Sequence, residues 1–167
     1  MKNKKFITNE TIDILKEIPT QTLIDALWVK EWPQGFIEGA LPLQLGQRMA
    51  GRAVTLRFVP HRPDIVEDKP KGVDSAEYVA IELCGPYEIL VVDALRWQYS
   101  SIGGDIKFLR MHQLEAGGLV TDGGVRDSIS LKEYGFPVYS ASTTAKQGPG
   151  EFWPWQVNDA IQCGGVL

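Results

Sequence analysis

Two charged residues, Arg126 and Asp127, follow a glycine-rich turn and are the first candidates for chemistry in this sequence. The apolar run at 118–120 is typical of a strand, and Gly123 and Gly124 allow close approach of the backbone. In open α/β sheets ligands bind at the carboxyl ends of the strands, where this pair would lie. A cation beside a carboxylate could hold an anionic substrate and a metal ion together.

A third candidate, Asp105, is separated from Arg126 by twenty residues. Residues 88–93 contain a continuous apolar run of the type found in buried strands, and residues 105–116 favour a helix. With the strand that follows, this order predicts a parallel pair joined by a right-handed crossover. Asp105 then begins the helix after the first strand, while Arg126 and Asp127 follow the second. Both loops should therefore meet at one edge of the sheet.

This corner has the groups needed to bind an anion and a cation. The carboxylates of Asp105 and Asp127 suit a hard divalent cation such as magnesium. The free N–H groups that begin helix 105–116 could bind an anion, and Arg126 could hold a carboxylate or an enolate oxygen with two hydrogen bonds. The alternative is structural, with Asp105 as a helix cap and Arg126–Asp127 as a surface ion pair.

Other reactive side chains give weaker signals. His61 and His112 have neither metal-ligand nor catalytic-triad spacing. Lys107 is expected to be an exposed helix lysine, since a Schiff-base lysine needs burial or a lowered pKa. Cys84 and Cys163 are far apart in the sequence, which favours buried thiols over a disulfide framework or a zinc motif.

The composition is that of one globular domain spanning residues 1–167. The chain is 44% apolar and 23% charged, and its length allows a sizeable core. A net charge of −4 does not favour a nucleic-acid partner. No run approaches the length of a membrane span, and no signal-peptide core follows the basic N-terminus. We expect a cytoplasmic protein without a membrane partner.

The remaining pattern predicts the elements that position these side chains. N-terminal helices are expected within 9–29, at 9–17 and 20–29, because Pro19 interrupts the helical spacing. The core at 51–167 is expected to add a strand at 52–59, helices at 74–83 and 128–134, and a strand at 136–140. Loops are expected at 33–51, 66–73, 94–104 and 141–155, and the beginning of another strand at 161–167.

Five segments occur in an order and at intervals that carry a resemblance. They are Gly51–Thr55, Leu90–Ala94, Gly104–Ile106, Val120–Asp127 and Cys163–Val166. From about residue 18 onward, the chain resembles the regulator of ribonuclease activity A-like family. That family includes 4-hydroxy-4-methyl-2-oxoglutarate aldolases, and some members carry a demethylmenaquinone methyltransferase label.

The resemblance implies both a fold and an activity. The fold would be α/β, of the swivelling phosphohistidine-domain type, with a central mixed sheet in a β/α/β sandwich, assembled as homotrimers or hexamers. The activity would be that of a lyase dependent on Mg²⁺ or Mn²⁺, an aldolase or decarboxylase. It would cleave a pyruvyl-containing oxo-acid through a metal-stabilised enolate.

In the aldolase branch the resemblance also assigns roles to residues. Asp127 would be the metal ligand, and Asp105 would position water on the metal or transfer a proton. Arg126 would bind the pyruvyl oxygens and stabilise the enolate. The backbone N–H groups of Ile106 and Lys107 would receive the substrate carboxylate.

Glycine at position 104 would complete this substrate-binding set, because Gly104 lets a ligand approach the backbone before Asp105. The sequence departs from the aldolase pattern at Ser130, where that pattern has an acidic residue. Members known only as ribonuclease regulators also lack the acidic residue. The alternative is therefore a non-catalytic protein that binds a ribonuclease or helicase.

The position of the last residue leads to one further expectation. The chain ends at Leu167, where relatives continue with a Pro-Gly-Asp turn and more strands, so the sheet is expected to lack its C-terminal strands. Retention of Asp105, Arg126 and Asp127 favours the enzyme over the regulator.

Overall fold

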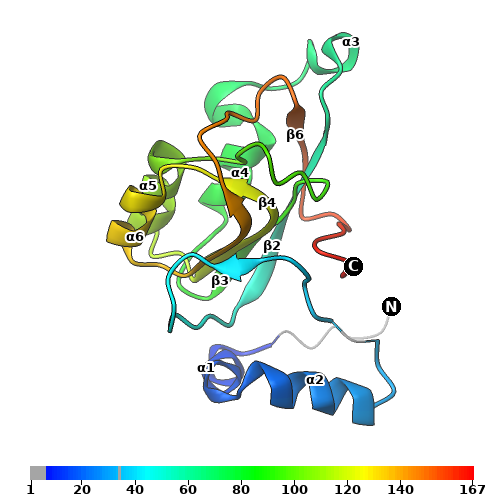
Figure 1. Ribbon diagram of the computed structural model, residues 1–167, viewed down its shortest axis with the longest axis vertical. Helices are drawn as coiled ribbons and strands as arrows, with labels where there is room; N and C mark the ends of the chain where they lie inside the picture. The colour runs from blue at the N-terminus through cyan, green and yellow to red at the C-terminus, as the bar shows by residue number, and fades with distance from the viewer. Residues whose placement is uncertain (1–6, 34) are drawn as a thin grey trace.

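The computed structural model describes residues 7–33 and 35–167 and has an α/β fold (Figure 1). In this described part, six strands form a mixed sheet in the order β1-β5-β4-β3-β2-β6. The parallel strands are β2 (Arg52–Pro60), β3 (Glu88–Asp93), β4 (Gly118–Val125) and β5 (Val138–Thr143). The antiparallel edge strands are β1 (Leu41–Pro42) and β6 (Phe152–Val157). The predicted α/β class with a central mixed sheet is confirmed.

Helices connect the parallel strands. The crossovers contain α3 (Pro63–Val66), the 3₁₀ helix η1 (Gly72–Asp74), α4 (Ala76–Glu82), α5 (Asp105–Gln113) and α6 (Ser128–Tyr134). Each crossover leads to the adjacent strand, so right-handed connections place α4, α5 and α6 on one face, where α5 contacts both of the others. None of the helices in the described ranges is both long and apolar enough to cross a membrane.

The β3–α5–β4 unit is held by the burial of apolar side chains. Every residue of β4 is buried, and α5 buries Phe108 and Met111, which lie three residues apart and so face the same side of the helix. The predicted strand–helix–strand order is confirmed. The helix ends at Gln113 rather than at residue 116, since Glu115 has a left-handed backbone (φ 55°) that a helix cannot contain.

The N-terminal helices have the predicted bounds, with α1 at Asn9–Glu17 and α2 at Thr20–Val29. Figure 1 shows both helices at the lower edge of the molecule, apart from α4, α5 and α6. Helix α1 buries Ile12, whereas α2 buries no side chain. Trp28 and Trp32 are 72% and 68% exposed. This leaves an apolar face on α2 without a partner in the described chain.

Two sequence predictions are wrong near the C-terminus. Residues 141–155 were expected to be loop but include the start of β6, whose Pro154 is compatible with an edge strand. Residues 161–167 were expected to begin a strand but form only a bridge between Cys163 and Val166. Gly164 and Gly165 between them have φ angles of 51° and 94°, which turn the chain back on itself.

A third prediction is wrong near the N-terminus. The short strand β1 lies in the predicted loop 33–51.

Two buried carboxylates hold the C-terminal segment against the ends of β3 and β4. Asp122 accepts hydrogen bonds from the Ala94 N–H at 2.7 Å and the Gly164 N–H at 3.2 Å. Asp93 accepts one from the Gln162 N–H at 3.2 Å. Burial raises the pKa of Asp122 above the usual range of an aspartate. These contacts fix the backbone beside the carboxyl ends of the parallel strands.

Replacing Asp122 with alanine tests this attachment. Asp122→Ala leaves two backbone N–H groups without an acceptor, and we expect it to lower the free energy of unfolding by about 2 kcal/mol. Urea denaturation followed by circular dichroism measures the change. As a control, Asp64→Ala removes an exposed aspartate paired with Arg62 and should change stability by less than about 0.5 kcal/mol. Equal effects of the two variants would contradict the role given to Asp122.

Candidate functional site

The loops after β3 and β4 meet at the carboxyl ends of these strands. The Ile102 N–H donates to the Gly124 carbonyl at 2.9 Å, and the Arg126 N–H donates to the Gly103 carbonyl at 3.1 Å. The start of α5 is thereby fixed beside the residues that follow β4. The sequence prediction that these two loops meet at one edge of the sheet is confirmed.

The carboxylate of Asp127 joins the two loops. Its Oδ2 accepts hydrogen bonds from the Asp105 N–H and from Arg126 Nε, both at 3.1 Å. Asp127 precedes α6 in a left-handed conformation (φ 55°) and makes no capping hydrogen bond to that helix. The Asp105 N–H, with Arg126 adding to it, holds the pKa of Asp127 below the usual range. Arg126, Asp105 and Asp127 therefore lie in one hydrogen-bonded cluster.

Arg126 and Asp127 are not a freely exposed surface pair. Their side chains are 33% and 34% exposed, respectively. Gly104 packs directly beneath them. A Cβ at this position would lie 2.1 Å from Asp127 Oδ2 and 2.8 Å from Arg126 Nε, so any side chain there would displace both groups. The absence of a side chain at Gly104 is therefore needed to accommodate the Arg126 and Asp127 side chains, in addition to allowing a ligand to approach the backbone.

Asp105 has a structural role as well as a place in the cluster. Its Oδ1 accepts a hydrogen bond from the Ile106 N–H at 2.8 Å, within the first turn of α5. The helix-capping alternative from the sequence is wrong, because Asp105 is the first residue of α5 and its N-cap is Gly104, with no side-chain capping hydrogen bond. The Ile106 amide, predicted to receive a substrate carboxylate, is therefore engaged by Asp105 here. A carboxylate that binds there would replace this intrahelical bond.

Two hollows flank the cluster and share Asp105 and Arg126. An open groove of about 640 Å³ is lined by Asp127 and Ser130 on one side of them. A cavity of about 330 Å³ lies on the other side and is lined by Gly104, Lys107 and other residues. The cluster therefore borders two spaces, either of which could receive a small molecule.

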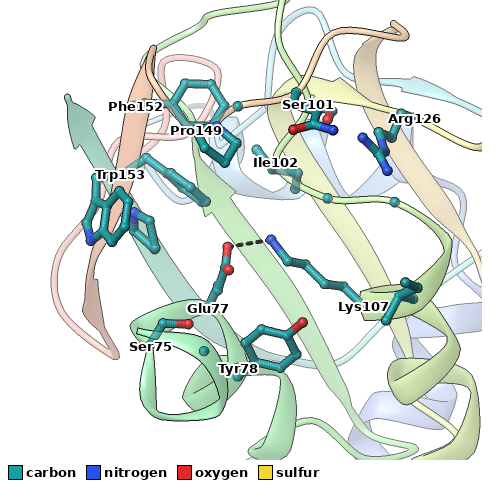
Figure 2. Close-up of a pocket in the computed structure, with 18 of the residues that line it drawn as sticks. Ser75, Glu77, Tyr78, Ser101, Ile102, Lys107, Arg126, Pro149, Phe152 and Trp153 are labelled. Carbon is teal, nitrogen blue, oxygen red and sulfur yellow. Dashed lines mark hydrogen bonds and ion pairs between the residues drawn. The ribbon is translucent and has the colours of Figure 1, made fainter. Parts of the chain in front are cut away.

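The prediction that Lys107 has an exposed side chain is wrong. Its side chain is only 24% exposed, and its Nζ lies 2.7 Å from Glu77 Oε2 in an ion pair between α5 and α4 (Figure 2). Sequence reasoning missed Glu77, because nothing local to residues 74–83 indicates that α4 lies beside α5. Only the order of the helices along the sheet brings the two charges together.

The other reactive side chains lie outside both hollows. His112 stacks on Tyr134 with ring centroids 5.6 Å apart. His61 lies beside Trp153 at 6.0 Å. Cys84 and Cys163 are buried and unpaired, as expected, and burial raises the pKa of both thiols to about 12. Neither thiol is therefore a ready nucleophile near pH 7.

The carboxylates of the cluster are compatible with a hydrated divalent cation. Within residues 7–33 and 35–167, no group of three or more His, Cys, Asp or Glu side chains is placed to enclose a metal ion. Mg²⁺, however, usually binds through one or two carboxylates and keeps several waters. Both hydrogen bonds to the Asp127 carboxylate fall on Oδ2, which leaves Oδ1 for a cation. Asp105 would supply the second carboxylate.

The chain is similar in sequence to known proteins. The family model "RraA-like: Aldolase/RraA" matches residues 20–167. A curated protein of Halalkalibacterium halodurans, named "Putative 4-hydroxy-4-methyl-2-oxoglutarate aldolase", is 27% identical over 155 residues. The match covers 90% of this chain, and the chain spans 65% of the length of that relative.

Solved structures show the same fold. The structure of RraAS2 from Streptomyces coelicolor, described as an unusual member of the RNase ES inhibitor RraA protein family, matches with a TM-score of 0.85 and 26% identity. That match covers 97% of this chain and 77% of RraAS2. The RNA-processing inhibitor RraA from Thermus thermophilis matches with a TM-score of 0.63 at 22% identity, over 90% and 82% of the two chains.

Gly104→Ala tests whether the cluster forms only when position 104 has no side chain. The added methyl group should displace the Asp127 carboxylate from the Asp105 N–H, so the pKa of Asp127 should rise toward about 3.9. In the unaltered protein the lowered pKa stabilises the fold above about pH 3.9, and this contribution is lost as the pH falls through the lowered value. An NMR titration of the ¹³C-labelled carboxyl measures the shift.

The matched control for this titration is Gly35→Ala. A Cβ at Gly35 would have Leu27 as its nearest neighbour at 3.8 Å, an ordinary contact. The titration of Asp127 should be unchanged in this variant. An unchanged Asp127 pKa in Gly104→Ala would contradict the packing described here.

Proposed function

We propose that this chain, which belongs to the RraA-like family of aldolases and RraA proteins, is a lyase. It would use a divalent cation to cleave a pyruvyl-containing oxo-acid. The observation that carries the proposal is the single hydrogen-bonded cluster of Asp105, Arg126 and Asp127 between two hollows. The guanidinium of Arg126, the two carboxylates and the adjacent space suit a reaction that forms an enolate.

Arg126 is the group that would hold the substrate. Arg126 lines both hollows, and its guanidinium can donate to the carboxylate and 2-oxo oxygens of a pyruvyl unit. The start of α5 lies beside it, so the Lys107 N–H, and the Ile106 N–H once released by Asp105, can donate to the same carboxylate. The scissile bond would then lie next to Asp105.

In a 4-hydroxy-2-oxo acid the bond between C3 and C4 breaks. Its electron pair moves to C3 and the 2-oxo oxygen and forms the enolate of pyruvate, while the C4 hydroxyl loses its proton and becomes a carbonyl. We assign Asp105 to accept this proton and to return one to C3, directly or through water. Arg126 stabilises the negative oxygen as its charge develops.

The cation belongs beside Asp127 in this proposal. Asp127 Oδ1, with Asp105 nearby, would hold Mg²⁺ or Mn²⁺. When bound, the ion supplies positive charge at the 2-oxo group. With its pKa below the usual range, the Asp127 carboxylate is ionised at neutral pH and can bind the ion.

A second candidate function is supported by Ser130. This residue lines the groove beside Asp127 at the position where the aldolase pattern has an acidic side chain. RraAS2 is described as a member of a ribonuclease-inhibitor family. The second candidate is therefore a non-catalytic regulator that binds a ribonuclease or a helicase. It does not require the Asp105–Arg126–Asp127 cluster.

A metal-dependent assay decides between these functions. With Mg²⁺, we expect pyruvate release from 4-hydroxy-4-methyl-2-oxoglutarate or oxaloacetate, and Arg126→Ala should lower kcat/KM by at least about 100-fold. The control is Arg110→Ala, which removes an exposed arginine paired with Glu82 and should leave turnover unchanged. Turnover that needs no metal, or that survives Arg126→Ala, would contradict the proposal. Inhibition of a ribonuclease or helicase without turnover would favour the regulator.

We also propose that the chain assembles as a homotrimer or hexamer. Its support is the unpartnered apolar face of α2 and the following segment, where Trp28, Val29, Trp32 and Phe36 are between 57% and 78% exposed. Such a face is typical of an interaction surface.

Light scattering coupled to gel filtration tests this assembly. The expected mass is three or six times 18.6 kDa. Trp28→Asp combined with Trp32→Asp should shift the protein toward the monomer, whereas Ile106→Asp, an exposed change on α5, should not. A monomer at micromolar concentration would contradict this proposal and leave the assignment of the site intact.

A further inference from the structure

The cavity beside Arg126 is larger than a pyruvyl unit needs. Its volume is about 330 Å³. It lies between α4, the start of α5 and the segment that leads into β6 (Figure 2). Several residues of the lining are apolar or aromatic: Phe58, Tyr78, Ile102, Phe152 and Trp153. These side chains suit the carbon chain of a substrate.

The polar lining of the cavity, which also includes Lys71 and Gln147, contains a neutralised ion pair. Glu77 and Lys107 are 17% and 24% exposed and lie 2.7 Å apart, and Figure 2 shows their charged ends pointing toward each other. Lys107 Nζ also lies 5.9 Å from the ring centroid of Tyr78. Together the pair offers N–H donors on one side and a carboxylate acceptor on the other, with no net charge.

A buried hydroxyl adjoins this pair. Ser75 lines the same cavity and is 4% exposed, and its Oγ has no hydrogen-bond partner within the described residues. Buried polar groups without a partner are rare in folded proteins. A ligand hydroxyl that reached this side of the cavity could supply the missing partner after a rotation of the serine side chain.

These groups distinguish between two kinds of substrate tail. A hydroxyl can accept from Lys107 and donate to Glu77 at the same time. A second carboxylate would meet the negative charge of Glu77, and like charges brought together disfavour binding. The aromatic side chains of the lining add contact with the C–H groups of a hydroxylated chain.

We propose that this cavity binds the part of the oxo-acid beyond the bond that breaks, and that Glu77 and Lys107 select a neutral hydroxyl-bearing chain over a second carboxylate. The inference rests on the proposed function, because Arg126 must hold the pyruvyl end at the mouth of the cavity. Glu77 and Lys107 are specificity-determining residues in this account.

A matched pair of substrates tests the selection. Both 4,5-dihydroxy-2-oxopentanoate and 4-hydroxy-2-oxoglutarate release pyruvate by the same cleavage and differ only in a terminal hydroxymethyl or carboxylate group. With Mg²⁺, we expect kcat/KM to favour the hydroxymethyl compound by about tenfold or more. Glu77→Gln should shift this ratio toward the carboxylate compound by about tenfold, and Lys107→Met should shift it the opposite way.

The opposite signs separate selection from structure, because both variants break the same ion pair. Glu82→Gln is the control, because Glu82 pairs with Arg110 between the same two helices but lies outside the cavity. The ratio of kcat/KM for the two substrates should be the same in this variant as in the unaltered protein. Equal turnover of the two substrates, preference for the carboxylate, or the same shift in both variants would overturn this inference alone. Absence of pyruvate release from every oxo-acid would overturn the proposed function and this inference with it.

Discussion

The candidate site depends on one carboxylate oxygen. Asp127 Oδ2 accepts from the first amide of α5 and from Arg126 Nε, so it connects the loop after β3 to the loop after β4. The contact requires a left-handed backbone at Asp127 and the absence of a side chain at Gly104. The buried β3–α5–β4 unit holds both loops in place, and the charges of the site lie on a rigid part of the fold.

Much of the fold could be predicted because buried strands appear in the sequence as runs of apolar residues. Strand β3 is a nearly continuous apolar run and β4 begins with one, so the sequence indicates a strand on each side of the intervening helix. The strand β6 was missed because Pro154 and its neighbouring tryptophans do not alternate with polar residues. The expected strand at 161–167 was wrong because the φ angles of Gly164 and Gly165 depend on the docking of that segment by buried carboxylates.

The site was predictable only in part, for a similar reason. Asp105, Arg126 and Asp127 could be placed together because each follows a strand of the same parallel pair. Lys107 was expected in solvent, and its pairing with Glu77 depends on the packing of α4 against α5. That packing is tertiary and has no local sequence signal. Periodicity could therefore locate the cluster but not the cavity beside it.

The central claim is that Asp105, Arg126 and Asp127 bind one cation and one pyruvyl group together. A crystal structure of the protein with Mg²⁺ and oxalate, an analogue of the pyruvate enolate, tests this most directly. The account predicts Mg²⁺ on Asp127 at about 2.1 Å, with oxalate bound to the ion and hydrogen-bonded to Arg126. Oxalate and Mg²⁺ bound elsewhere, or a site that stays empty at saturating concentrations of both, would contradict it.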